Sequence, residues 1–167
     1  MTVTNVRKDP EALTMQVTAE LDVPVERAWQ LWADPRQLER WWGPPTFPAT
    51  VVDHELETGG RVTYFMTGPD GDSFHGWWKI LRVDAPRRLE LEDGFADDRG
   101  QPNPDLPTTT MVVDLTEGPG GATLMAITSR FPSLEAMEQL TAMGMDEGIR
   151  AAMGQMDDIL LEDATSR

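Results

Sequence analysis

Cysteine is absent from the 167-residue sequence, which excludes disulfide bonds, thiolate nucleophiles and cysteine-based zinc sites. The sequence also lacks an apolar run of the roughly 20 residues that a transmembrane helix needs. No apolar stretch follows Arg7 and Lys8, as a secretory signal would require. These absences predict a cytoplasmic protein with no membrane insertion.

Positive charge is scarce: 14 lysines and arginines stand against 29 aspartates and glutamates, a formal net charge of −15 at pH 7. So acidic a surface repels phosphate backbones and anionic head groups, and we expect no nucleic-acid partner. The excess is concentrated in residues 85–167, which hold six cations and sixteen acids. The overall composition, 40% hydrophobic and 26% charged, predicts a single domain over 1–167 with a core at about 13–163.

The N-terminal part of the chain shows first a strand pattern and then two helix patterns. Apolar and polar residues alternate over 13–22, the period of a half-buried strand. Apolar residues then recur at helical spacing from Val25 to Trp32, directly after Pro24. Asp34 and Pro35 are typical of the start of a second helix, which we expect to end near Trp42.

Residues 48–131 carry only strand and turn signals. Short Gly- and Pro-rich turns separate the apolar segments, which favours antiparallel neighbours over parallel strands joined by helices. One connection is long, the Pro- and Asp-rich segment Gly94–Pro107, and it is a candidate lid. The predicted strands are Ala49–Leu56, Arg61–Met66, Phe74–Val83, Arg88–Asp93, Thr109–Glu117 and Ala122–Phe131.

A helical pattern begins at Pro132-Ser133 and runs to about Asp163. Gly144 and Gly148 interrupt it, and each costs about 1 kcal/mol relative to alanine inside a helix. We therefore expect a short helix, a break near Gly144 and a long terminal helix.

Several local motifs resemble those of one protein family, and the similarity covers roughly Leu13–Leu161. The family comprises homologues of the activator of the heat-shock-protein ATPase, a branch of the START-like (SRPBCC) superfamily whose bacterial members often carry a polyketide-cyclase label. The resemblance implies an α+β helix-grip fold: a curved antiparallel sheet of about seven strands wrapped around a long C-terminal helix, with two short helices after the first strand. The motifs are Val25-Glu26-Arg27-Ala28-Trp29 before Asp34-Pro35, Leu38-x-x-Trp41-Trp42-Gly43-Pro44, Gly59-Gly60-Arg61, Val83-Asp84-x-Pro86-x-Arg88-Leu89 and Gly144-Met145-x-x-Gly148.

A ligand cavity between sheet and helix is implied by this fold. Five of the ten methionines lie in the C-terminal helical segment, together with several small residues, which suits an adaptable apolar space. The alternative is that these residues only pack the helix closely on the sheet. If there is a cavity, the residues expected to line it are Trp42, His54, Tyr64, His75, Trp77, Asp93, Phe95, Met145, Ile149 and Met153.

Catalytic chemistry finds little support in the sequence. His54 and His75 lie on predicted strands and could face one cavity, but a strand histidine more often lies on the solvent face. Their spacing does not favour a metal site, no serine lies in a nucleophile elbow, and no cofactor motif is present. A buried carboxylate such as Asp93 would be suited to general acid–base work, yet with 29 acids some fall near any pocket by chance. We therefore assign no catalytic residue.

Trp77 and Trp78 are adjacent on a strand, so one ring faces each side of the sheet, and we expect the outer ring to form an exposed apolar surface. The cavity itself would suit a flat or hydrophobic molecule. The acids of the candidate lid favour a neutral or cationic ligand, and an anionic one would require Arg61, Arg130 or Arg150 in the lining.

Two functions remain open on the sequence. One is binding of a small hydrophobic molecule, with or without cofactor-free cyclase- or hydrolase-type chemistry. The other, implied by the family resemblance, is a chaperone cofactor or protein-interaction module. A homodimer is also left open.

Overall fold

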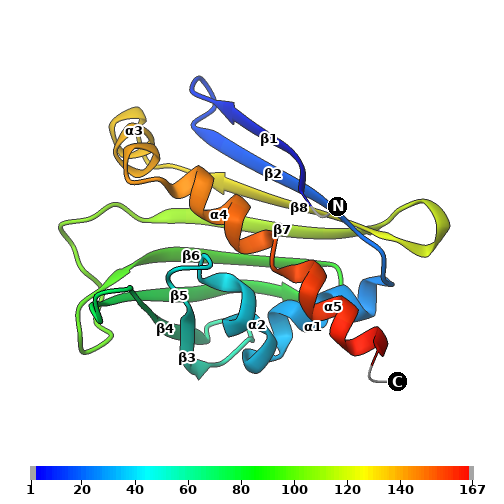
Figure 1. The fold of residues 1–167 in the computed structure, drawn as a ribbon. Helices are drawn as coiled ribbons and strands as arrows, with labels where there is room; N and C mark the ends of the chain where they lie inside the picture. The colour runs from blue at the N-terminus through cyan, green and yellow to red at the C-terminus, as the bar shows by residue number, and fades with distance from the viewer. Residues whose placement is uncertain (1–2, 166–167) are drawn as a thin grey trace.

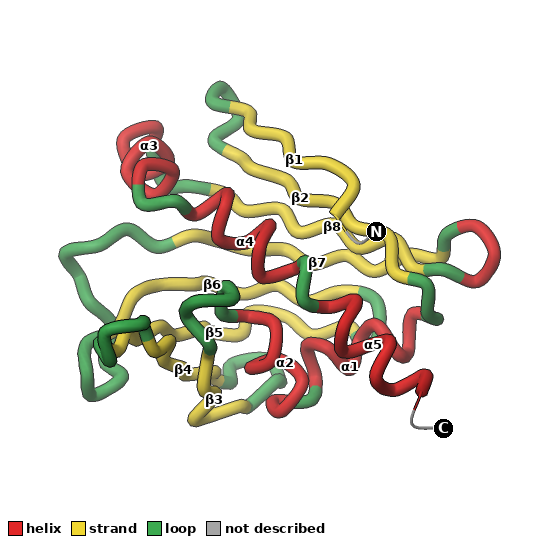
Figure 2. The backbone as a smooth tube through the Cα atoms, viewed as in Figure 1, coloured by secondary structure: helices red, strands yellow, loops and turns green. Residues whose placement is uncertain are grey.

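The computed structural model describes residues 3–165, which form one eight-stranded antiparallel sheet with helices along one face (Figures 1 and 2). The strand order is β1-β2-β8-β7-β6-β5-β4-β3. The strands are β1 Val3–Asp9, β2 Thr14–Leu21, β3 Ala49–His54, β4 Arg61–Thr67, β5 Ser73–Asp84, β6 Arg88–Ala96, β7 Thr109–Glu117 and β8 Thr123–Arg130. The helices are α1 Val25–Ala33, α2 Pro35–Trp42, the 3-10 turn η1 Pro119–Gly121, α3 Leu134–Ala142, α4 Met145–Met153 and α5 Met156–Thr165.

The predicted helix-grip fold is confirmed, with eight strands in place of about seven. The additional strand, β1, pairs with β2 and places Val6 opposite Val17. Its residues are mostly polar, and Arg7 and Lys8 lie next to each other in it. A strand at the edge of a sheet can be short of apolar residues, so β1 has little of the alternation that reveals a half-buried strand. No helix within residues 3–165 is long and apolar enough to cross a membrane.

The two short helices after β2 form as predicted. Asp34 caps α2, because its Oδ1 accepts a hydrogen bond from the backbone N–H of Arg36 at 2.9 Å. The Gln37 side chain donates to the other carboxylate oxygen of Asp34 at 3.0 Å. Both helices bury their tryptophans: Trp32 and Trp41 have no exposed surface, and Trp41 Nε1 donates to the Leu31 carbonyl at 2.8 Å.

The C-terminal segment has the predicted break and also a second one. Gly144 lies between α3 and α4 with φ of 85°, a left-handed conformation that glycine adopts without strain. The expected long terminal helix is instead two helices, α4 and α5, separated at Gly154 and Gln155. Glycine weakens the helix there, and Gln155 Nε2 donates to the Gly43 carbonyl at 2.6 Å, which ties this break to the end of α2. Figure 1 shows α4 and α5 crossing the sheet diagonally.

The candidate lid is shorter than expected because β6 continues to Ala96. The chain then turns back on this strand: Ala96 forms an isolated bridge with Pro102, and the N–H of Asn103 donates to the Phe95 carbonyl at 2.8 Å. The Asp97 carboxylate closes the turn by accepting from the N–H groups of Arg99 and Gln101. These backbone hydrogen bonds lower the pKa of Asp97.

Candidate functional site

Two adjoining cavities lie between the helix-bearing, inner face of the sheet and helices α3 and α4. The first lobe has a volume of about 210 Å³ and the second about 180 Å³. Tyr64, Asp93 and Met145 line both, so the lobes meet at these side chains. The other lining residues of the first lobe are Gly94, Phe95, Pro107, Thr109, Leu140, Met143 and Gly144, and those of the second are Trp42, Pro44, Met66, Met111, Gly148 and Ile149.

The register of β4, β5 and β6 brings Tyr64 and Asp93 together at the junction of the lobes. Tyr64 pairs with Gly76, and Asp93 pairs with Trp78 two residues along the same strand, β5. A Cβ at Gly76 would lie 2.4 Å from the Tyr64 ring, so the ring crosses β5 only because position 76 has no side chain. The Tyr64 hydroxyl thereby reaches the next strand, where it donates to Asp93 Oδ1 at 3.2 Å.

The carboxyl group of Asp93 is held in a poorly solvated position. Burial raises its pKa from 3.8 to about 7. Hydrogen bonds from Tyr64 and the Gly94 backbone, together with the nearby indole N–H of Trp78, stabilise the charged form and oppose this rise. Burial and the neighbouring Asp93 charge also raise the pKa of Tyr64 well above its ordinary value, so the phenol keeps its proton. The pair therefore combines a neutral donor with a carboxyl that titrates near neutral pH.

Tryptophans surround this pair. The ring centroids of Trp42 and Trp78 lie 5.8 and 6.2 Å from that of Tyr64 and 4.9 Å from each other. The Nε1 atoms of Trp32, Trp42 and Trp78 are buried without a hydrogen-bond partner of normal geometry among the described residues. The Trp78 indole nevertheless lowers the pKa of Asp93, as expected of an N–H dipole close to a carboxylate. The pair thus lies in an environment with aromatic walls and few competing polar groups.

Positive charge is missing from the cavity lining. Neither lobe has a lysine, arginine or histidine among its described lining residues. Arg61, Arg130 and Arg150, which an anionic ligand would require, are all exposed and line neither lobe. Asp93 is the only acidic residue in the described lining of either lobe, and it has no cationic side chain beside it there.

The ten residues proposed from the sequence divide into two groups. Four of them line neither lobe: His54, His75, Trp77 and Met153. The six that line one or both lobes are Trp42, Tyr64, Asp93, Phe95, Met145 and Ile149.

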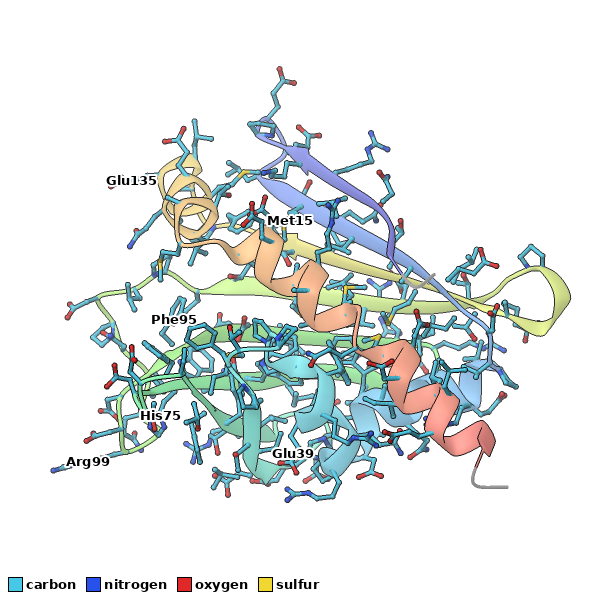
Figure 3. All side chains as sticks on the ribbon, in the orientation of Figure 1. Met15, Glu39, His75, Phe95, Arg99 and Glu135 are labelled. Atoms are coloured by element: carbon cyan, nitrogen blue, oxygen red, sulfur yellow. The ribbon has the colours of Figure 1, made fainter. Side chains whose placement is uncertain are left out.

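The expectation that His54 and His75 face one cavity is wrong. His54 Nε2 lies 3.0 Å from the carbonyl oxygen of Trp32, a hydrogen-bonding contact to α1. His75 lies on the opposite, outer face, where it lines a groove of about 230 Å³ together with Arg99, and Figure 3 shows these two side chains near each other. Because side chains alternate along a strand, His75 and Trp77 face away from the inner-face residues Gly76 and Trp78.

Trp77 is the tryptophan of the pair that faces the outer side of the sheet. The expectation that its ring forms an exposed apolar surface is also wrong. Only 8% of Trp77 is accessible. Its ring lies against Gly94 on the neighbouring strand, where a Cβ would come within 2.6 Å of the indole, and its Nε1 donates to the Phe95 carbonyl at 3.0 Å. Met153, the last residue of α4, is fully buried in the core.

The acidic part of the candidate lid lies away from the cavity. Within the candidate lid Gly94–Pro107, the residues that line the first lobe are Gly94, Phe95 and Pro107, whereas Asp98 lines the outer groove with His75. The sequence could not show this, because the side on which a loop folds depends on contacts such as those of Asn103 with β6.

Several lining residues were not proposed from the sequence, among them Met66, Thr109, Met111, Leu140 and Pro44. Alternation would have found two of them, since Met66 lies two residues from Tyr64 on β4, and Met111 lies in the alternating apolar pattern of β7. The role of Gly76 could not be inferred from the sequence, because this residue contributes no side chain and instead leaves space for the Tyr64 ring of β4.

A curved antiparallel sheet with a cavity between it and its C-terminal helices is the helix-grip, START-like (SRPBCC) architecture. The family profile described as Activator of Hsp90 ATPase homolog 1-like protein matches residues 22–161, and the chain belongs to that family. A comparison with functionally curated proteins gave no match.

Solved structures agree with this assignment. The chain is 51% identical to protein Ms6760 from Mycobacterium smegmatis, with a TM-score of 0.88 over 95% of this chain and 96% of that one. It is 50% identical to a protein from Arthrobacter aurescens, with a TM-score of 0.92 and coverage of 96% and 93%. DynU16 from the dynemicin biosynthetic locus shares the fold at 21% identity and a TM-score of 0.60, over 89% of this chain and 47% of that one.

Proposed function

We propose that this protein binds a small, largely hydrophobic molecule in the two lobes, and that it does so in the cytoplasm. The observation that carries the proposal is an apolar, aromatic cavity with one carboxyl–phenol pair at its centre. Ligand sites are typically mostly apolar, with a few polar groups that fix orientation. Together the lobes reach the lower end of the roughly 300–1,000 Å³ range of such sites, which suits a ligand of one or two rings.

Cofactor-free chemistry on such a ligand would depend on Asp93. Its pKa of about 7 is suited to accepting a proton near neutral pH. The single O–H of Tyr64 donates to the Asp93 carboxylate, and once that carboxylate has taken up a proton the O–H can turn to an oxygen of the ligand. Proton abstraction next to a carbonyl, the first step of an aldol-type ring closure, can use a carboxylate that takes the proton and a hydroxyl that donates a hydrogen bond to the enolate oxygen.

Thermal shift against lipids, aromatic acids and flavonoid-like compounds tests the binding. A ligand at 100 times its Kd stabilises the folded state by about 2.7 kcal/mol, a shift of several degrees in a domain of this size. The absence of a shift with every compound in the panel would contradict the proposal.

A pair of variants on α4 makes the test specific to the cavity. A Cβ at Gly148 would meet only Pro44 within 4 Å, at 3.9 Å, so the backbone there accepts a side chain. Gly148 lines the second lobe, so the leucine of Gly148→Leu would occupy space in that lobe. Leucine also favours a helix more than glycine does. Ala151→Leu adds a similar volume at an exposed position of the same helix. We expect Gly148→Leu to abolish the ligand-induced shift and Ala151→Leu to preserve it.

The family supports a second candidate function, that of a chaperone cofactor, because its description refers to an activator of the Hsp90 ATPase. The measurement is the ATPase rate of Hsp90 with and without this protein. Stimulation that survives Gly148→Leu would favour the cofactor function over ligand binding, and an unchanged rate at saturating protein would exclude it.

A further inference from the structure

We propose that Tyr64 and Asp93 select ligands that carry a protonated amine next to an apolar body, with the amine placed at the junction of the two lobes. This inference rests on the proposed ligand-binding function and names the chemical class of its ligand.

The first step is the position of the carboxyl group. Asp93 lines both lobes, so a ligand in either lobe lies close to it. Tyr64 donates to Oδ1, which fixes the orientation of the carboxyl group. No cationic side chain is among the described lining residues, so nothing there competes with a ligand cation for the carboxylate.

The second step is electrostatic. A carboxylate in an apolar cavity without a counter-ion is poorly stabilised, as the raised pKa of Asp93 reflects. An ammonium group at the junction would supply the missing counter-ion and form a charge-assisted hydrogen bond. A ligand carboxylate in the same place would repel Asp93 and find no positive partner in the lining.

The third step concerns the aromatic walls. Trp42 and Tyr64 line the second lobe with ring planes at 84° to each other, so the lobe is bounded by ring surface in two orientations. Aromatic faces attract cations, most strongly where water is excluded. The cation would therefore meet Asp93 at one side and aromatic rings at another.

The charged groups of the surrounding elements do not oppose a cation. In the first turn of α4, Asp146 is paired with Lys8 of β1 at 2.7 Å, and Glu147 is exposed and acidic. On β6, Glu92 precedes Asp93 and faces the outer side of the sheet, where it lines a separate groove with Lys79. Tyr64 and Asp93 are the only titratable residues in the described lining of the lobes.

The experiment uses three probes with one apolar body and different head groups: 4-phenylbutylamine, 4-phenylbutan-1-ol and 4-phenylbutanoic acid. Their Kd values are measured by NMR titration of the full chain at about pH 8, where the amine is protonated and Asp93 is charged. We expect the amine to bind about tenfold or more tightly than the alcohol, and the acid to bind most weakly. Lowering the pH to about 6 should weaken amine binding about tenfold and leave alcohol binding unchanged.

Two variants locate the effect. Asp93→Asn keeps the size of the side chain and should make the Kd values of amine and alcohol equal. Glu92→Gln removes the same charge one residue away on the outer face and should preserve the difference. Equal affinities for amine and alcohol in the unmodified protein, or tightest binding of the acid, would overturn this inference and leave the proposed function intact. Failure of all three probes to bind would overturn both.

Discussion

The inner and outer faces of the sheet at β4–β6 place similar residues in opposite environments. Asp93 and Glu92 are neighbours on β6, yet Asp93 lies at a cavity without a cation and Glu92 lies opposite Lys79. Trp78 and Trp77 are neighbours on β5, yet Trp78 belongs to an aromatic cluster and Trp77 lies flat against a glycine. One sheet thus supports a poorly solvated site on one face and a polar surface on the other.

The difference shows that two adjacent residues of the same chemical type in a strand can have different environments, because their side chains lie on opposite faces of the sheet. On the outer face, Glu92 lies opposite Lys79 and Asp53 lies 3.9 Å from Arg61, so these acids have cations near them. On the inner face, a single carboxyl remains uncompensated because burial in the cavity outweighs the hydrogen bonds from Tyr64 and Gly94. We therefore expect substitutions on the two faces to differ in sign, in size and in their pH dependence.

The largest expected effect is stabilisation by Asp93→Asn. Because the folded pKa of Asp93 is raised, the folded state binds its proton more tightly than the unfolded state, and the stability that this proton provides is lost as pH rises from about 4 through about 7. The neutral asparagine avoids this loss, so the variant should be more stable by about 4 kcal/mol at pH 8.5 and by about 2 kcal/mol at pH 5.5. Urea denaturation at the two pH values measures the difference. Glu92→Gln is the control, and equal effects of the two variants would show that Asp93 is not buried as described.

Two glycine-to-alanine variants, one on each face of the sheet, test whether the two faces act separately on stability and on ligand binding. Gly76→Ala should cost about 1–3 kcal/mol, because its Cβ would collide with Tyr64, and Gly94→Ala should cost a similar amount through Trp77. Urea denaturation gives both values. Gly76→Ala displaces Tyr64 from Asp93, whereas Gly94→Ala displaces Trp77 on the outer face, so Gly76→Ala should weaken amine binding more. Equal losses of amine affinity in both variants would contradict the separation of the faces.

Tyr64→Phe should have a smaller effect on stability, about 1 kcal/mol, since it removes one hydrogen bond and keeps the ring. It should also raise the pKa of Asp93 above about 7, because the phenol stabilises the charged carboxylate. Carbon-detected NMR titration of the Asp93 carboxyl measures this shift. An unchanged pKa would mean that the 3.2 Å hydrogen bond does not persist in solution.

The smallest expected effect is that of Arg61→Ala on the outer face. Arg61 and Asp53 are both about half exposed and lie 3.9 Å apart, so the change should alter the free energy of unfolding by less than about 0.5 kcal/mol. Thermal shift with the amine probe should be unchanged. Loss of ligand binding in Arg61→Ala would indicate that the ligand binds in the outer groove and not in the two lobes.

Most of the fold could be predicted from the sequence, because alternation, helical spacing and turn residues act locally. The break at Gly144 follows from the conformational freedom of glycine. The break at Gly154 depends on Gln155 reaching α2, and β1 depends on pairing with β2, so neither could be inferred from its own segment.

The candidate site could be predicted only in part. Asp93 was proposed as a carboxylate that a cavity could bury, and Tyr64 as one of the aromatic residues expected to line that cavity, and both line it. The hydrogen bond between Tyr64 and Asp93 was not predicted, because it depends on the register of β4, β5 and β6 and on the space above Gly76. His75 and Trp77 were misplaced because a pattern of period two shows which residues share a face, without showing which face covers the cavity.

The tryptophans around the cavity also give the protein an optical property. The rings of Trp32, Trp41, Trp42 and Trp78 form a continuous set of contacts with centroids 4.7 to 6.4 Å apart. At such separations indole transitions couple, so absorbed energy is shared across the set, and rotation of Trp42 by a ligand would alter the near-ultraviolet circular dichroism of all four. If a ligand binds in the second lobe as proposed, the signal of these four rings would report it with no added label.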